Sequence, residues 1–152
     1  MLGDYCPSGG TSLRIYALIG WKNQELSLLV NNKFDITIYN MQHQMKLATE
    51  PYNNIASGKK VIESRLFDEK RQKISPGDEI VFSENDNPEN TVSRVVSGLL
   101  RYPTFKELFA DNEPALFGED SRDFLLTQIK SFYSDEDEQK YGVVGVLLEM
   151  ID

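Results

Sequence analysis

Length, composition and charge limit the kind of protein that this sequence can encode. It has 152 residues, of which 40% are hydrophobic and 26% charged; these values suit one globular domain and exclude collagen, a coiled coil and wholesale disorder. The net charge of −8 argues against binding to duplex DNA, which requires a strong positive field.

One cysteine and one histidine restrict the redox and metal chemistry. A single thiol, Cys6, cannot form an internal disulfide, so we expect a reducing, cytoplasmic compartment. One cysteine and His43 cannot supply a structural zinc site, and no motif indicates a metal or an organic cofactor. The apolar run over residues 13–21 is too short to span a membrane and lacks the basic start of a secretory signal.

The charges are unevenly distributed along the chain. Residues 57–76 hold six basic and three acidic residues, whereas residues 107–152 hold three basic and twelve acidic ones. A basic segment in an acidic protein suggests a small anionic target that is held at one place. The acidic segment is more typical of a solvated face than of a partner surface, so a protein-interaction module that uses it is the least favoured function.

Hydrophobic alternation predicts the strands in chain order. Residues 1–12 are a loose tail, and the alternation between residues 26 and 38 predicts a hairpin with Asn31–Lys33 as its loop. Beyond it, strands are predicted over residues 42–47, 61–67, 79–83, 91–100 and 143–151.

Local end signals predict the helices between these strands. Pro51 suits the first turn of a short helix and Gly58 its end, because glycine can take a positive φ. Residues 104–107 fit a capping box that begins a second helix. Ser134 is predicted to cap an acidic helical turn over residues 135–140. Before it, a helix is predicted over residues 120–132, with four side chains directed inward: Phe124, Leu125, Ile129 and Phe132.

Together these elements predict an α+β fold, a small mixed β-barrel of about five to six strands with flanking helices. Within it, the segment from Gly58 to Leu66 combines three charged residues. Along a strand, Glu63 and Arg65 share one face, and Lys60 can join them only if it lies in the turn after Gly58. The spacing alone favours a surface ladder of charges on a strand edge over a converging cluster.

Several separated motifs, in this order, resemble the ASCH domain family. They are His43–Leu47, Pro51, Gly58–Lys60, Glu63, Arg65–Leu66, Asp68, Lys70–Arg71, Ile74 and Gly77–Phe82. Farther on, Arg101–Phe109 and Tyr133–Val146 resemble the small bacterial proteins of that family. The resemblance implies a PUA-like β-barrel with a cleft beside the Gly-x-Lys-x-x-Glu-x-Arg segment, and it implies RNA or a nucleotide as the ligand, because related PUA domains bind RNA.

The resemblance begins near residue 43 and divides the chain in two. We expect residues 43–152 to form the ASCH domain and residues 1–42 to be an N-terminal extension that either forms a hairpin or is poorly ordered. Because Met41 directly precedes the start of the resemblance, an overlong gene start is the other interpretation of this extension.

The favoured interpretation is an RNA- or nucleotide-binding module, with a modified nucleoside as a further candidate ligand. Glu63 can accept a hydrogen bond from an exocyclic amine such as cytosine N4. The other candidate ligand-binding residues supply cations for phosphate, aromatic rings for stacking or a further contact: His43, Lys59, Lys60, Arg65, Lys70, Arg71, Tyr102 and Tyr133.

The alternative is an enzyme, because one branch of the family resembles an amidohydrolase that deacetylates N4-acetylcytidine. That branch uses a Lys, a Thr three residues later and a downstream Glu. Lys60 matches the Lys, whereas Glu63 stands at the Thr position, so Lys60 and Glu63 are the catalytic candidates and a hydroxyl nucleophile is missing. Three residues are open as the downstream carboxylate: Glu107, Glu113 and Glu119.

Overall fold

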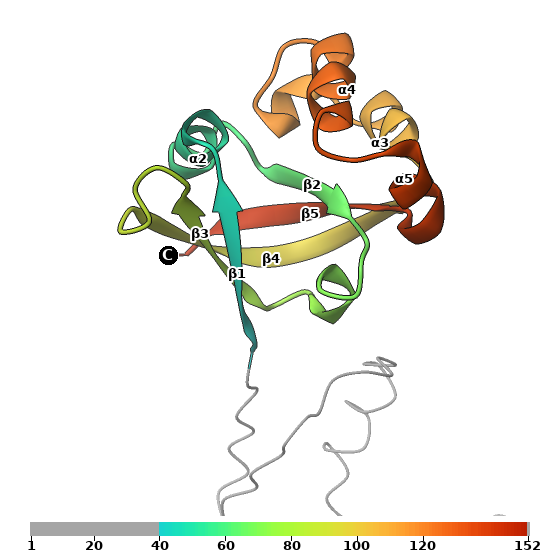
Figure 1. The fold of residues 1–152 in the computed structure, drawn as a ribbon. Coiled ribbons are helices and arrows are strands. Elements are labelled where there is room, and N and C mark those ends of the chain that lie inside the picture. The colour runs from blue at the N-terminus through green and yellow to red at the C-terminus, as the bar shows by residue number, and fades with distance from the viewer. Residues whose placement is uncertain (1–39, 152) are drawn as a thin grey trace, which may run out of the picture. The chain divides into compact units, whose positions relative to one another are not determined.

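The computed structural model describes residues 40–151 (Figure 1). The tail over residues 1–12 and the hairpin expected between residues 26 and 38 lie outside the described residues. In the described part of the chain, the predicted strands and helices are present, most of them within two residues of the expected bounds.

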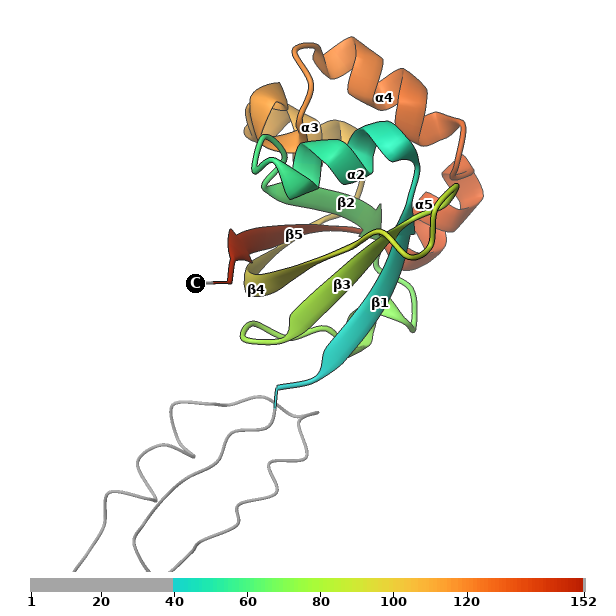
Figure 2. The ribbon, with the colours of Figure 1, turned by 90° about the vertical axis from the view of Figure 1, so that its left-hand side faces the viewer.

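Five strands form one sheet in the order β1-β3-β4-β5-β2. Their bounds are β1 Gln42–Leu47, β2 Ile62–Leu66, β3 Glu79–Glu84, β4 Thr91–Tyr102 and β5 Val143–Met150. The β1–β3 pair is parallel and the other pairs are antiparallel. The sheet curls into a half-barrel whose two edges are β1 and β2 (Figures 1 and 2). This mixed arrangement confirms the predicted α+β class.

In the views of Figures 1 and 2, most of the helices lie above the strands. Helix α2 connects β1 to β2, a 3-10 turn η1 precedes β3, and the remaining helical segments lie between β4 and β5. Their bounds are α2 Thr49–Ala56, η1 Arg71–Lys73, α3 Phe105–Asp111, η2 Pro114–Phe117, α4 Arg122–Lys130 and α5 Asp135–Tyr141. The predicted caps are present: the hydroxyl oxygens of Thr104 and Ser134 accept hydrogen bonds from backbone amides at the starts of α3 and α5.

The prediction for helix α4 is wrong at two of its four apolar positions. Leu125 is buried, but Phe124 is 48% exposed and Phe132 is 69% exposed. Phe124 lies about 100° around the helix axis from Leu125, off the buried side of the helix. Phe132 follows the helix, which ends at Lys130, so the helical period does not extend to it.

Two apolar clusters fill the domain on either side of the curled sheet. The first includes Ile80, Phe82 and Val146 and is closed by Ile55 of α2. The second packs the buried face of β2 against α3 and α4 through residues that include Ile62, Phe105, Leu108, Phe109 and Leu125. Strand β5 contributes to both clusters, with Val146 in the first and Val143 in the second, whereas β2 belongs to the second alone.

A buried arginine fixes the end of helix α2. Arg94 on β4 is 8% exposed, and its Nη2 atom donates to the carbonyl oxygens of Ile55 at 2.7 Å and of Ala56 at 3.1 Å. A positive charge at these terminal carbonyls also complements the helix dipole. Because the chain turns toward Lys60 directly after this point, Arg94 helps to position the charged segment that follows.

Arg94→Met should lower the free energy of unfolding by about 2 kcal/mol, since it leaves the two carbonyls without their charged donor. Arg101→Met is the matched control on the same strand: its guanidinium lies on the surface, 3.1 Å from the centroid of the Phe67 ring, and its loss should cost only about 0.5–1 kcal/mol. Urea unfolding of both variants measures the difference, and equal costs would contradict the role assigned to Arg94.

Candidate functional site

The turn after helix α2 directs Lys60 away from the line of strand β2. Gly58 has φ +79°, a left-handed conformation that favours glycine. The backbone amide of Lys60 donates to the Asn54 carbonyl at 2.8 Å, and that of Val61 donates to the Leu116 carbonyl at 2.9 Å. These bonds hold Lys60 in the turn, which is the placement that convergence with Glu63 and Arg65 requires.

Three charged side chains meet beside this turn. The Nζ atom of Lys60 lies 2.6 Å from Glu63 Oε2, and Arg65 Nε donates to Glu63 Oε1 at 2.7 Å. Glu63 is only 3% exposed, so its carboxylate lies beneath the two cations. Of the two arrangements that the spacing allows, the structure has the converging cluster and not the surface ladder.

Opposing effects act on the acidity of Glu63. Burial by itself raises the pKa of this carboxyl, but the charges of Lys60 and Arg65 and their hydrogen bonds outweigh burial and hold the pKa below its ordinary value. Glu63 is therefore ionised at neutral pH. A low pKa makes the carboxylate a stable hydrogen-bond acceptor and weakens it as a general base.

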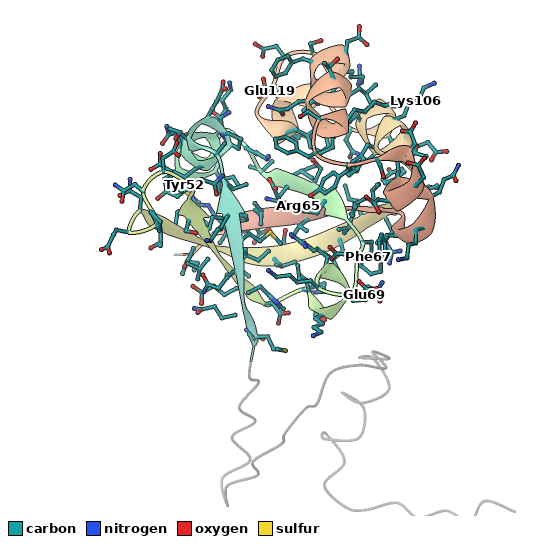
Figure 3. All side chains as sticks on the ribbon, in the orientation of Figure 1. Tyr52, Arg65, Phe67, Glu69, Lys106 and Glu119 are labelled. Carbon is teal, nitrogen blue, oxygen red and sulfur yellow. The ribbon has the colours of Figure 1, made fainter. Side chains whose placement is uncertain are left out.

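Arg65 connects the two edges of the half-barrel. Besides its bond to Glu63, its Nη2 atom donates to the carbonyl oxygen of Lys46 on β1 at 3.1 Å. Its Nη1 atom lies 3.5 Å from the hydroxyl oxygen of Tyr133. Figure 3 shows Arg65 between β1 and β2. One guanidinium thus spans the open seam between the two edge strands.

A cavity of about 450 Å³ opens at this seam. Its volume falls within the range of about 300–1,000 Å³ that is usual for small-molecule sites. Six charged residues line it, three basic and three acidic: Lys46, Lys60, Arg65, Glu50, Glu63 and Glu119. The cavity therefore has no large excess of either charge.

Apolar side chains from the second cluster form the opposite wall. Phe109, Phe117 and Ile129 line the cavity together with Tyr133, whose ring stacks on that of Phe105 at a centroid distance of 5.6 Å. A polar side that faces an apolar wall is the usual composition of a site for a flat, partly polar ligand.

Gly118 brings a second carboxylate to this cavity. Its φ is +86°, and a Cβ atom there would lie 3.2 Å from Lys60 Cβ and 3.1 Å from Asn54 Nδ2. The absence of a side chain lets the loop approach Lys60, so that the next residue, Glu119, lines the cavity (labelled in Figure 3). The other two candidate carboxylates do not line it.

Five of the predicted ligand-binding residues lie within the described part of the chain but do not line this cavity: His43, Lys59, Lys70, Arg71 and Tyr102. The Nε2 atom of His43 lies 2.8 Å from Asp78 Oδ2, and Arg71 Nη1 donates to Asp68 Oδ2 at 2.9 Å. Lys60, Glu63, Arg65 and Tyr133 are the predicted residues that the structure brings together around the cavity.

Sequence reasoning missed several residues that line the cavity. Asn54, Gln128 and Phe132 are among them. Gln128 lies three residues after Leu125 within helix α4, and this spacing is the signal that would have placed it on the same side of the helix. Phe132 follows the end of the helix, so the helical period does not place it. Asn54 carried no comparable signal, because its position depends on how α2 packs against the loop at Gly118.

Two absences hold for residues 40–151, the part that the structure describes. No group of three or more His, Cys, Asp or Glu side chains there is arranged to hold a metal ion. None of the described helices is long and apolar enough to cross a membrane.

Comparison with known proteins gives one family match. The family model of the ASCH domain matches residues 45–151. The crystal structure of hypothetical protein PH0355 is similar, with 36% sequence identity, a TM-score of 0.65, and coverage of 73% of this chain and 100% of that chain. The solution structure of protein PF0455 from Pyrococcus furiosus has 32% identity and a TM-score of 0.60, and the match covers 74% of this chain and 99% of that chain.

A more distant match is the crystal structure of an ASCH protein from Zymomonas mobilis. It has 14% identity and a TM-score of 0.45, and the match covers 71% of this chain and 66% of that chain. No curated protein matches this chain.

Glu63→Gln should destabilise the domain in a pH-dependent way. Because the pKa of Glu63 is lower in the folded chain than in the unfolded one, its stabilisation is present above about pH 4.3 and is lost as the pH falls through the lowered value. We expect the variant to lose about 3 kcal/mol of unfolding free energy at neutral pH, since it leaves two cations unpaired. Below about pH 4 the difference from the wild type should narrow.

The matched control is Glu113→Gln, which changes an exposed carboxylate that lies 3.5 Å from Arg122. Its effect should stay near zero at every pH. Urea unfolding between about pH 3 and pH 7 measures both differences. A Glu63→Gln difference that stays constant over this range would show that the carboxylate is not held ionised in the fold.

Proposed function

This chain belongs to the ASCH domain family, and from that premise we propose that its cavity binds a nucleobase presented by RNA or by a nucleotide. The observation that carries the proposal is the buried Glu63 carboxylate between Lys60 and Arg65, beside an apolar wall. A base needs both features, because its edge exchanges hydrogen bonds while its faces are apolar.

The hydrogen-bonding pattern suits a base that carries an exocyclic amine. Glu63 accepts from the amine, and Lys60 or Arg65 donates to a ring nitrogen or carbonyl oxygen. Lys60 Nζ now lies 2.6 Å from Glu63 Oε2. In the proposed complex, the amine of the base replaces Lys60 Nζ as the donor to Glu63 Oε2. The ammonium group of Lys60 then donates to the carbonyl oxygen of the base. Cytosine, or a modified pyrimidine with an amine at the same position, fits this pattern.

The charges around the cavity favour recognition of the base over recognition of phosphate. Basic and acidic residues are equally numerous there, and Lys70 and Arg71, which we expected to hold phosphate, do not line it. A single phosphate near the exposed Lys46 would be the main ionic contact. Affinity should then fall only about threefold between about 50 and 200 mM salt, far less than for a protein with many phosphate contacts.

Lys60→Met should raise the Kd for the bound nucleotide at least about tenfold, because it removes a charged hydrogen-bond donor while keeping the aliphatic stem and the Glu63–Arg65 pair. Lys59→Met, which changes the exposed neighbour outside the cavity, is the control and should bind as the wild type does. Calorimetric titration with the four ribonucleosides, their monophosphates and short single-stranded RNAs measures these affinities. Unchanged binding by Lys60→Met would place the ligand elsewhere.

Hydrolysis of an N4-acylated cytidine is the second candidate function, and the position of Glu119 favours it. Lys60, Glu63 and Glu119 line one cavity, and Glu119 is the only one of the three downstream candidates among its lining residues. Since Glu63 is a weak base, Glu119 would activate the water that attacks the amide carbonyl. Lys60 would stabilise the oxyanion, and Glu119 would pass the proton taken from water to the departing nitrogen as the C–N bond breaks, which releases cytidine and acetate.

Glu119→Gln should then abolish the release of cytidine from N4-acetylcytidine, whereas Glu113→Gln, which changes a carboxylate outside the cavity, should not. Chromatography after incubation with the purified protein measures the product. If the wild type releases no cytidine under conditions in which a known amidohydrolase does, this candidate is excluded and the binding proposal is unaffected.

A further inference from the structure

Phe132 is the most exposed large apolar side chain of the described residues. It is 69% exposed, and it lines the cavity beside Tyr133. Phe124 of the same helical segment is also exposed, at 48%, but does not line the cavity. An isolated exposed phenyl ring is ordinary on a protein surface. A ring at the rim of a cavity that also contains a buried ionic cluster is a candidate ligand contact.

Hydrogen bonds fix the main chain of the turn that carries Phe132. The amide of Phe132 donates to the Ile129 carbonyl at 3.1 Å, and the amide of Tyr133 donates to the same oxygen at 3.1 Å. The hydroxyl of Ser131 donates to the Gln128 carbonyl at 2.6 Å. The main chain of the turn is therefore closed by its own hydrogen bonds, so binding a flat ligand needs ordering of the Phe132 side chain but not of the turn.

The two consecutive aromatic residues have different environments. Tyr133 stacks on Phe105 and reaches Arg65, so it belongs to the inner wall. Phe132 has most of its surface in water. A base that fills the cavity contacts the inner wall, while the exposed ring offers a second stacking surface at the rim.

The charge near this rim determines which part of a nucleic acid can bind there. Helix α5 begins three residues after Phe132 with four consecutive acidic residues, Asp135 to Glu138. These carboxylates repel phosphate, and the nearby Lys130 is already 3.7 Å from Asp135. Stacking on an aromatic ring needs no positive charge, so a base, and not the sugar-phosphate backbone, is the part of the ligand that suits Phe132.

We propose that Phe132 stacks on a second nucleobase, adjacent to the base held in the cavity, so that the smallest complete ligand is a dinucleotide. This inference rests on the proposed function, because it assumes that the cavity holds the first base. It adds a subsite at the rim of the cavity, three residues before the acidic start of α5.

The test compares short ligands on matched variants. Calorimetry gives the affinities of the four ribonucleoside monophosphates and of the matching homodinucleotides for the wild type, Phe132→Ala, Phe132→Trp and Phe124→Ala. The wild type should bind its preferred dinucleotide about tenfold more tightly than the mononucleotide. Phe132→Ala should abolish that gain and weaken the mononucleotide by a clearly smaller factor, because Phe132 also lines the rim of the cavity. Phe132→Trp should keep the gain, and Phe124→Ala should behave as the wild type.

The outcomes separate this inference from the proposed function. If Phe132→Ala still binds the dinucleotide more tightly than the mononucleotide by the wild-type factor, the second subsite is refuted. The proposed function still stands in that case if Lys60→Met weakens binding of the mononucleotide. If Phe132→Ala weakens the mononucleotide and the dinucleotide by the same factor, the ring belongs to the site of the first base and the second subsite is again refuted. A wild type that binds none of these ligands refutes both proposals.

Discussion

The ionised carboxylate of Glu63, buried between Lys60 and Arg65, is the interaction on which the rest of the site depends. A buried carboxylate is costly unless each oxygen has a charged partner. Here the two partners come from different elements, one from the turn after helix α2 and one from strand β2. Because Arg65 also donates to the Lys46 carbonyl, the same cluster links the two open edges of the half-barrel.

The cavity lies where β1 and β2 are joined by the Arg65 side chain and not by backbone pairing. Strands β1 and β2 are the two ends of the sheet, and a side chain rather than a backbone ladder connects them. The space left between them is lined on one side by Leu47 of the first apolar cluster and on the other by Phe109 and Phe117 of the second. The polar cluster therefore lies at the boundary of the two cores, where an open seam admits a ligand and the packed walls keep it in place.

Local sequence signals predicted the helices and strands, but the site depends on where side chains point after a turn, which these signals do not specify. The alternating faces of the strand over residues 61–66 and the helix starts at Thr104 and Ser134 were predictable, because both signals act over a few residues. The convergence of Lys60 on Glu63 depends on the turn at Gly58, and spacing alone favoured a surface ladder. The count of charges over residues 57–76 treats these residues as one basic surface. In the structure, Lys60 and Arg65 line the cavity, whereas Arg71 pairs with Asp68 outside it.

Because the net charge is −8, the affinity of this chain for a nucleic-acid ligand must come from other contacts than in a basic protein. A basic protein gains affinity by releasing counterions along many phosphates, which is independent of base sequence. In the proposed complex that contribution is small, because the charges around the cavity balance and helix α5 is acidic. The affinity must then come from the base edge at Glu63 and from aromatic stacking. Both contacts depend on the identity and number of bases, so the acidic surface itself favours a short, base-specific ligand over a long strand.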